Sequence, residues 1–259
     1  MYGNIIFDNT DGVLRITLNR PDVYNALSPA LISEITQAML VAADDPSVRV
    51  VLLTGAGSKA FCSGADLKEA ALSGKSAADI LKEYYEPMVN AIRDLPKPVI
   101  CKLNGLAVGA GCSLALACDV VIAREDAYLS LLFVQIGLMP DAGSTFFLPR
   151  MIGLARAFEL ASTGRRIDAK EAHAIGLITK AVAPADLDSE TEALIQYYRN
   201  APTQAIGAMK RAFNQSSHSS LPQMLEWERE NQNMLFQTQD AKEGISAFLE
   251  KRKPDFQGH

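Results

Sequence analysis

The chain has 259 residues, with 25 Lys and Arg against 30 Asp and Glu and a formal net charge of −5. Apolar residues make up 48% of the chain and charged residues 21%, which is ordinary for a globular protein and excludes disorder of the whole chain. A chain of this length buries about three quarters of its unfolded surface, so it needs no disulfide or metal site for stability. The acidic balance argues against a nucleic-acid partner.

No segment has the pattern of a secretory signal or a membrane span. The first twelve residues contain acids and no basic residue. The longest uncharged run, residues 103–118, includes three glycines and is too short to span a bilayer. We therefore expect no membrane partner and a cytoplasmic protein.

The cysteine pattern is also what we expect of a cytoplasmic protein. The four cysteines form no CxxC pair, and each lies in an apolar context, which favours buried free thiols over a metal site. They are Cys62, Cys101, Cys112 and Cys118.

The first elements alternate between strand and helix patterns. Residues 13–19 alternate apolar and polar side chains, as in a half-buried strand, and are expected to pair with residues 4–8 across the turn at residues 9–12. Ser28 and Pro29 are typical of an N-cap and first helical residue.

The alternation continues along the chain. The apolar run at residues 48–54 is typical of a strand covered on both faces. Ser76 and Asp79 predict a helix that extends toward Arg93. Residues 98–103 and 120–123 are expected to be strands, and this order implies an α/β fold with helical crossovers.

The last part of the chain changes character. Asp168, with Glu171, is expected to cap a short helix, and from about residue 188 the pattern is almost wholly helical. Pro202 and Pro222 are expected in the first turns of helices. We therefore divide the chain into an α/β core, residues 1–197, and a C-terminal helical region, residues 198–259.

Residues 54–60 satisfy the GxGxxA pattern of dinucleotide-binding loops. No amphipathic helix follows the glycines, and no acidic residue lies about 20 positions further on. A plain loop is the better interpretation, and no nicotinamide cofactor is expected.

A second glycine-rich segment, residues 104–112, precedes a predicted buried helix of small residues. Gly109, Ala110 and Gly111 at a helix N-terminus would expose backbone N–H groups to an oxyanion. Close packing between strand and helix would require the same small residues, and the two interpretations stand equally.

Residues 137–145 contain Asp141 between a proline and an apolar stretch. An N-cap is the simpler interpretation of this aspartate. The functional interpretation is a general base at the mouth of an apolar pocket.

Other catalytic patterns have little support. None of the three histidines, His173, His218 and His259, neighbours a serine or cysteine in a nucleophile motif. The sequence has no HExxH motif or carboxylate cluster that would bind a metal.

Taken together, these segments resemble the enoyl-CoA hydratase/isomerase family, also called the crotonase superfamily. They occur in the family's order and cover nearly the whole chain. The matching segments are Asn19-Arg20-Pro21 with Asn25-Ala26-Leu27, Ala60-Phe61-Cys62-Ser63-Gly64-Ala65-Asp66-Leu67, and residues 104–111, 137–145 and 243–252.

The resemblance implies a spiral of ββα turns with a C-terminal helical region that forms trimers, often paired into hexamers. It implies an acyl-CoA thioester as substrate, so that coenzyme A is part of the substrate and no further cofactor is needed. The backbone N–H groups of Ala65 and Ala110 would bind the thioester oxygen and stabilise an enolate.

The resemblance also implies substrate contacts along the chain. The basic cluster at residues 251–253 suits phosphates, although a solvated tail is its simpler interpretation. The implied contacts are Asn25, Ala26, Ser63, Asp66, Leu67, Gly109, Leu132, Phe133, Pro140, Phe248 and Lys251.

The residue pattern favours one reaction over another. The hydratases of this family use two glutamates, and the corresponding positions here are Ser113 and Phe133. Asp141 remains, at a turn where isomerases of 3-enoyl-CoA and of ring-epoxyphenylacetyl-CoA carry an acid. We therefore predict an isomerase in which Asp141 moves a proton, with its pKa raised by an apolar wall that includes Leu132 and Phe133.

Four alternatives stay open. They are enoyl-CoA hydration, a dihydroxynaphthoyl-CoA synthase, a 4-chlorobenzoyl-CoA dehalogenase and a non-catalytic acyl-CoA-binding or scaffold protein. Outside the Asp141 turn, the chain matches the pattern of the dihydroxynaphthoyl-CoA synthases less well. The dehalogenase needs a supporting His and Trp, but no His falls in residues 60–145 and the single tryptophan is Trp227.

Overall fold

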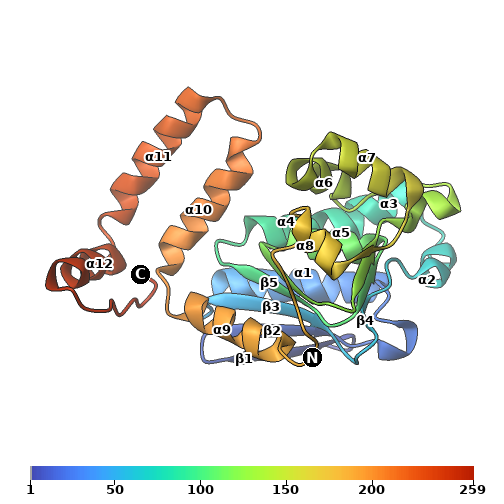
Figure 1. Ribbon diagram of the computed structural model, residues 1–259, viewed down its shortest axis with the longest axis horizontal. Coiled ribbons are helices and arrows are strands. Elements are labelled where there is room, and N and C mark those ends of the chain that lie inside the picture. Colours follow the sequence, from blue (N-terminus) through green and yellow to red (C-terminus); the bar gives the residue numbers. More distant parts are fainter. Residues whose placement is uncertain (1) are drawn as a thin grey trace.

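The structure is a computed structural model that describes residues 2–259 and contains two β-sheets surrounded by helices (Figure 1). The larger sheet has the strand order β1-β2-β3-β5-β7-β10, and the smaller has the order β4-β6-β8-β9. The strands are β1 (Ile5–Thr10), β2 (Val13–Leu18), β3 (Val50–Gly55), β4 (Ala60–Cys62), β5 (Val99–Leu103), β6 (Leu106–Val108), β7 (Val120–Arg124), β8 (Tyr128–Ser130), β9 (Ile167–Asp168) and β10 (Lys180–Val182).

Helices connect the strand pairs and cover the sheets. They are α1 (Pro29–Asp44), α2 (Leu67–Leu72), α3 (Ala77–Ile80), α4 (Glu86–Asp94), α5 (Ala110–Ala117), α6 (Ser144–Ile152), α7 (Leu154–Thr163), α8 (Ala169–Ala174), α9 (Leu187–Arg199), α10 (Thr203–Ser216), α11 (Leu221–Leu235) and α12 (Gln239–Glu250). Short 3₁₀ turns lie at Pro21–Val23 and Leu132–Ile136.

Three successive strand pairs build a spiral. In each of the pairs β3–β4, β5–β6 and β7–β8, the first strand joins the larger sheet and the second joins the smaller one. The strands β3, β5 and β7 are parallel to one another, as are β4, β6 and β8, and helices follow each pair. This arrangement is the predicted spiral of ββα turns and confirms the α/β fold class.

The N-terminal hairpin forms with a tighter turn than predicted. β1 and β2 are antiparallel, and Thr10 lies opposite Val13, so only Asp11 and Gly12 connect them. Both connecting residues have positive φ, 54° and 78°, as a two-residue turn of this kind requires. The strand predicted at residues 4–8 therefore extends to Thr10.

The central strand β3 is buried on both faces, as its apolar run predicts. Val51 and Leu53 face the main core, whereas Val50 and Leu52 pack with Ile195 of α9 on the other face. The alternation of side chains along the strand assigns the two sets to opposite faces.

Helix α1 begins as the sequence indicates. The Ser28 hydroxyl accepts a hydrogen bond from the Leu31 N–H at 3.1 Å, and Pro29 is the first helical residue. The glycine-rich segment at residues 54–60 ends β3 and begins β4, and its residues 56–59 form the expected plain loop between these strands.

The helix predicted from Ser76 toward Arg93 contains an irregular turn. It begins as α3 and ends as α4, with a π-helical turn at Leu81–Tyr85 in between. Pro87 has no N–H group, and its ring would clash with the carbonyl of Glu83 in a regular helix, which gives a physical reason for the wider turn.

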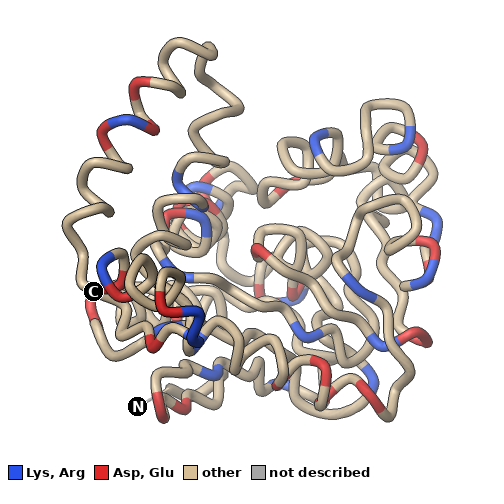
Figure 2. The backbone as a smooth tube through the Cα atoms, turned by 60° about the vertical axis from the view of Figure 1, so that its left-hand side comes forward, with Lys and Arg blue, Asp and Glu red and all other residues tan. Residues whose placement is uncertain are grey.

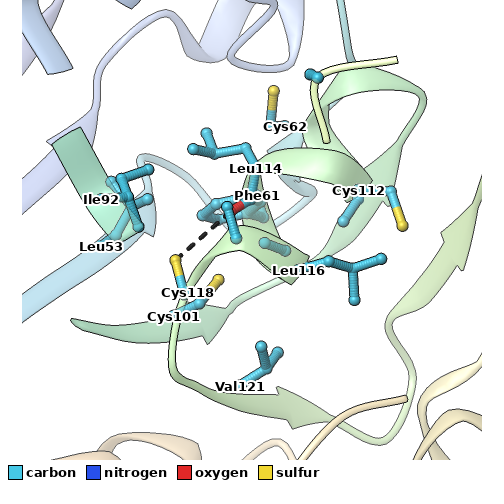
Figure 3. Packing of buried hydrophobic residues seen from close by; sticks show 14 of the residues in the cluster. Leu53, Phe61, Cys62, Ile92, Cys101, Cys112, Leu114, Leu116, Cys118 and Val121 are labelled. Atoms are coloured by element: carbon cyan, nitrogen blue, oxygen red, sulfur yellow. Dashed lines mark hydrogen bonds between the residues drawn. The ribbon is translucent and has the colours of Figure 1, made fainter. Parts of the chain in front are cut away.

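The four cysteines lie in the core as free buried thiols, which confirms their prediction (Figure 3). The Cys118 thiol contacts the carbonyl oxygen of Leu114 at 3.5 Å, drawn as the dashed line. Burial raises the pKa of the Cys62 thiol to about 12, so this group is a poor nucleophile.

The helices α11 and α12 extend away from the sheets, whereas α9 packs against them (Figure 1). Helix α10 connects the two parts, and its buried Lys210 donates to the Ile92 carbonyl oxygen and pairs with Asp119 at 2.6 Å. The predicted boundary after residue 197 falls in the last turn of α9, which ends at Arg199. Pro222 lies in the first turn of α11, as expected, but Pro202 precedes α10 as its N-cap instead of lying within it.

Basic and acidic residues are interspersed over core and helical region without gathering over one element (Figure 2). Among residues 2–259, no helix combines the length and apolar character that a bilayer crossing requires.

Candidate active site

The end of β4 and the start of α5 are in direct backbone contact. Gly64 has φ +94°, and a Cβ atom there would lie 2.8 Å from the Val108 carbonyl oxygen. A Cβ atom on Gly111 would lie 2.4 Å from the Cys62 carbonyl oxygen. Close packing therefore explains these glycines, and it also holds the two predicted oxyanion loops together.

The backbone N–H groups of Ala65 and Ala110 have no acceptor in the described part of the chain. Ala65 forms an isolated parallel bridge with Leu27 in which its neighbours make both hydrogen bonds: Leu27 donates to Gly64, and Asp66 donates to Leu27. The Ala65 N–H therefore points away from Leu27. Ala110 is the first residue of α5, where no carbonyl within the helix can accept its N–H.

Both alanines line one cavity of about 190 Å³. Its wall is mainly apolar, and it lies between the oxyanion loops, the irregular helix at residues 77–94 and the turn that follows β8. The predicted residues in the wall are Ser63, Ala65, Leu67, Gly109, Ala110, Leu132, Phe133 and Asp141.

Asp141 is the one charged residue among those that line this cavity. Its Oδ1 atom is buried, and no described residue donates a hydrogen bond to it. Burial in this apolar wall raises the pKa of the Asp141 carboxyl group from 3.8 to about 6. A carboxylate with this pKa is a competent proton acceptor near neutral pH.

The simpler interpretation of Asp141 as an N-cap is wrong. Helix α6 begins at Ser144, its N-cap is Gly143 with φ 86°, and no side chain caps it. Asp141 contributes only its main-chain oxygen, which accepts from the Ser144 N–H at 3.1 Å. The side chain is left to face the cavity.

The two positions at which hydratases carry glutamate have different roles here. Ser113 is fully buried and does not line the cavity; its hydroxyl contacts the Asp141 carbonyl oxygen at 3.0 Å and the Ser144 hydroxyl at 2.5 Å. Phe133 forms part of the cavity wall. Neither residue supplies a second carboxylate.

Asn25 and Asp66 support the loops and do not face the cavity. Asn25 is 0% exposed, and its amide accepts from Arg20 N and donates to the carbonyl oxygens of Ala56 and Ala60. The Asp66 carboxylate caps α2 and pairs with Arg20 at 3.0 Å. The polar side-chain atoms of both residues are therefore already bonded within the chain, and substrate contact at these two positions stays a prediction.

Four other predicted contacts lie outside the cavity wall. Ala26 and Pro140 are next to lining residues but do not line the cavity themselves. Phe248 lies on α12 and Lys251 directly follows it. Helix α12 and the cavity-lining helix α2 are at opposite ends of the long axis of the molecule (Figure 1), so one chain does not bring Phe248 and Lys251 to the cavity.

The irregular helix contributes cavity residues that no sequence motif predicted. Ile80, Leu81 and Tyr85 all line the cavity from this segment. Pro87, inside a predicted helix, was the available signal, since π turns often occur at functional sites.

Comparison with known proteins agrees with this geometry. The sequence matches the family described as Enoyl-CoA hydratase/isomerase over residues 8–259. A Rhodobacter capsulatus protein named probable enoyl-CoA hydratase is 43% identical over 257 residues, 99% of each chain. The 1,2-epoxyphenylacetyl-CoA isomerase of Escherichia coli is 38% identical over 251 residues, 95% of each chain.

Solved structures of enoyl-CoA hydratases have the same fold as this chain. The crystal structure of an enoyl-CoA hydratase from Bacillus anthracis has a TM-score of 0.92 and 37% identity, and the match covers 99% of this chain and 100% of that one. The chain therefore belongs to the enoyl-CoA hydratase/isomerase family.

Proposed function

We propose that this protein is an acyl-CoA isomerase that converts 3-enoyl-CoA into trans-2-enoyl-CoA, with Asp141 as the single base. The observation that carries the proposal is one half-buried carboxylate whose buried Oδ1 atom receives no hydrogen bond from residues 2–259, in a cavity that the unpaired backbone N–H groups of Ala65 and Ala110 also line. These are the groups that proton abstraction next to a thioester requires.

The reaction balances without a cofactor. Asp141 takes a proton from C2, and the C–H electron pair moves toward the thioester oxygen to give a dienolate. The Ala65 and Ala110 N–H groups stabilise the negative charge on this oxygen, at about 3 kcal/mol for each donor. Asp141 then returns the proton to C4, and the double bond lies between C2 and C3.

Enoyl-CoA hydration is the second candidate, favoured by the 43% identity to the Rhodobacter capsulatus protein named probable enoyl-CoA hydratase. Hydration by the two-carboxylate route lacks both carboxylates here, because neither Ser113 nor Phe133 has a carboxyl group, and Ser113 is also fully buried. A hydratase would therefore need Asp141 to activate water alone, without the roughly 10²–10⁴-fold contribution of a second acid–base group.

The two candidates give different products. Purified protein supplied with a 3-enoyl-CoA should form the conjugated 2-enoyl-CoA, and Asp141→Asn should abolish this reaction. A protein that forms only 3-hydroxyacyl-CoA from 2-enoyl-CoA would be a hydratase. Saturable thioester binding without any product would indicate a non-catalytic binding protein.

We also propose that a second copy of the chain completes the coenzyme-binding part of the site. Phe248 is 83% exposed, and it lies with Lys251 far from the cavity of its own chain. A trimer, or a pair of trimers, would cover the apolar surface of the C-terminal helices and bring this end of one chain toward another. The large exposed apolar residues of that surface include Phe213, Leu221, Leu225, Met234, Phe236 and Phe248.

A further inference from the structure

The cavity contains a second polar side chain, from a segment that the proposed mechanism does not use. Tyr85 lines the cavity and is 5% exposed, with its ring in the main core. Its hydroxyl group makes no hydrogen bond to any residue in the range 2–259. The hydroxyl oxygen is not one of the fully buried atoms that lack a partner, so it keeps accessible surface at the cavity that Tyr85 lines, where water binds it in the free protein.

The irregular helix places Tyr85 at the cavity. Tyr85 is the last residue of the π-helical turn, in which the Glu86 N–H donates to the Leu81 carbonyl oxygen. Leu81 and Tyr85, the first and last residues of this turn, both line the cavity. Such a turn is less favourable than regular helix and often marks a functional position.

Tyr85 and Asp141 line the same cavity without a hydrogen bond between them. Burial, and secondarily the Asp141 charge, raise the pKa of the Tyr85 hydroxyl above its ordinary value. Tyr85 therefore stays protonated throughout the working pH range and acts as a hydrogen-bond donor, not as a base.

A ligand oxygen is the group that can replace water at this hydroxyl without loss of a hydrogen bond. Most other side chains in the cavity wall are apolar, and the Ser63 hydroxyl already contacts the Val23 carbonyl oxygen at 3.2 Å. The Ala65 and Ala110 amides are assigned to the thioester oxygen. A hydrocarbon acyl chain has no atom that could accept a hydrogen bond from the Tyr85 hydroxyl, so this donor indicates an acyl group that contains oxygen.

We propose that the Tyr85 hydroxyl donates a hydrogen bond to an oxygen atom of the acyl group, so that the protein prefers acyl-CoA thioesters with an ether, epoxide or hydroxyl oxygen in that group. This inference rests on the proposed function in one respect, that the cavity holds the acyl part of a thioester. It does not depend on which reaction Asp141 performs.

A set of unreactive thioesters tests the preference. Cyclohexylacetyl-CoA is the reference, and the 3-yl and 4-yl isomers of tetrahydropyranylacetyl-CoA replace one ring CH₂ with oxygen at two positions. None has a double bond to move. Calorimetric titration of the wild-type protein should give about 3- to 10-fold tighter binding of at least one oxygen-containing thioester, as one added hydrogen bond implies.

Tyr85→Phe should remove this preference and leave the affinity for cyclohexylacetyl-CoA within about 2-fold, because only the hydroxyl group is lost. Tyr84→Phe is the matched control: its hydroxyl accepts from Lys75 at 3.3 Å, and Tyr84 does not line the cavity. This variant should keep the wild-type preference.

Three results would overturn the inference: equal wild-type affinity for all three thioesters, a preference that persists in Tyr85→Phe, or an equal loss of affinity for all three in that variant. The last would make Tyr85 a purely structural residue. If the binding preference holds but no isomerisation of 3-enoyl-CoA is found, the proposed reaction fails while the role of Tyr85 stands. If none of the thioesters binds, the acyl site itself is wrong and both proposals fail.

Discussion

The hydroxyl group of Ser113 donates a hydrogen bond of 3.0 Å to the main-chain carbonyl oxygen of Asp141. The same hydroxyl lies 2.5 Å from the Ser144 hydroxyl and 3.4 Å from the Gly109 carbonyl oxygen. The hydratases of the family carry a glutamate at the position of Ser113. In this chain, Ser113 instead holds the turn that contains Asp141. Ser113 is a positioning residue that acts through Asp141.

Ser113→Ala should lower kcat about 10-fold and leave KM nearly unchanged. The substitution removes the hydrogen bond between Ser113 of α5 and the Asp141 carbonyl oxygen, which positions the Asp141 side chain. The variant should also lose about 1–3 kcal/mol of unfolding free energy, since the Asp141 carbonyl oxygen keeps only the Ser144 N–H as donor and the buried Ser144 hydroxyl loses its partner. Steady-state kinetics and denaturant unfolding measure the two effects.

The control for this substitution is Thr54→Val, which removes another hydroxyl-to-carbonyl bond of 3.0 Å, between Thr54 and Lys102. It should cost similar stability without affecting kcat. Equal losses of kcat in both variants would show that Ser113 acts only through general stability.

Asp141→Asn should raise the melting temperature above that of the wild type at neutral pH. The folded-state pKa of about 6 lies above the ordinary 3.8, so the fold favours the protonated acid. The stability that Asp141 provides is fully present below about pH 4 and is lost as pH rises through about 6. Thermal melts should show a small difference between the two proteins at about pH 4 and a growing one up to about pH 7. A constant difference would contradict burial of this carboxylate.

The activity should depend on pH through the same group. Asp141 must be ionised to accept a proton, so kcat/KM should rise with pH through a midpoint of about 6 and level off above it. A pH profile between about pH 4.5 and 8.5 measures this midpoint. A profile that is already level at its acid end would mean that Asp141 keeps the ordinary pKa of 3.8 and faces solvent.

Gly64→Ala should lower kcat/KM by about 10²–10³-fold, because the new Cβ atom would force apart the two loops that hold the oxyanion donors. The space for it is already occupied by the Val108 carbonyl oxygen, at 2.8 Å. Gly74→Ala is the control: Gly74 also has positive φ, +67°, but nothing lies within 4 Å of its Cβ position. Full activity in Gly64→Ala would argue against the Ala65 and Ala110 donors.

Lys251→Asn should raise KM for acyl-CoA about 10-fold and leave kcat unchanged, if this residue of one copy binds the coenzyme phosphates in another. Asparagine tolerates the left-handed φ of 56° at this position. Lys242→Ala, on α12, is the control for general loss of positive charge. Light scattering on the same samples should give the mass of a trimer or hexamer, and a monomer of full activity would exclude the shared site.

Local signals predicted much of the fold. The Ser28 cap, the alternation in β2 and the Asp168 cap of α8 each depend on residues within a few positions, and each forms as expected. The spiral topology came from the family resemblance, because the division of consecutive strands between two sheets leaves no local pattern.

The orientation of site residues was harder to predict. Asp141 has the local pattern of an N-cap, and its orientation depends on Ser113, which is 28 residues away. Asn25 matches a family motif, but its amide is used to hold the loop before β4. Tyr85 was missed because its role depends on a helical irregularity and not on hydrophobic periodicity.

The most direct test of the central claim is isomerisation of a 3-enoyl-CoA in D₂O, with the product analysed by mass spectrometry. If Asp141 alone carries the proton from C2 to C4, the product is 2-enoyl-CoA, a substantial part of it free of deuterium, and Asp141→Asn forms none. A product heavier by one water, or undiminished turnover in the Asp141→Asn variant, would contradict the account.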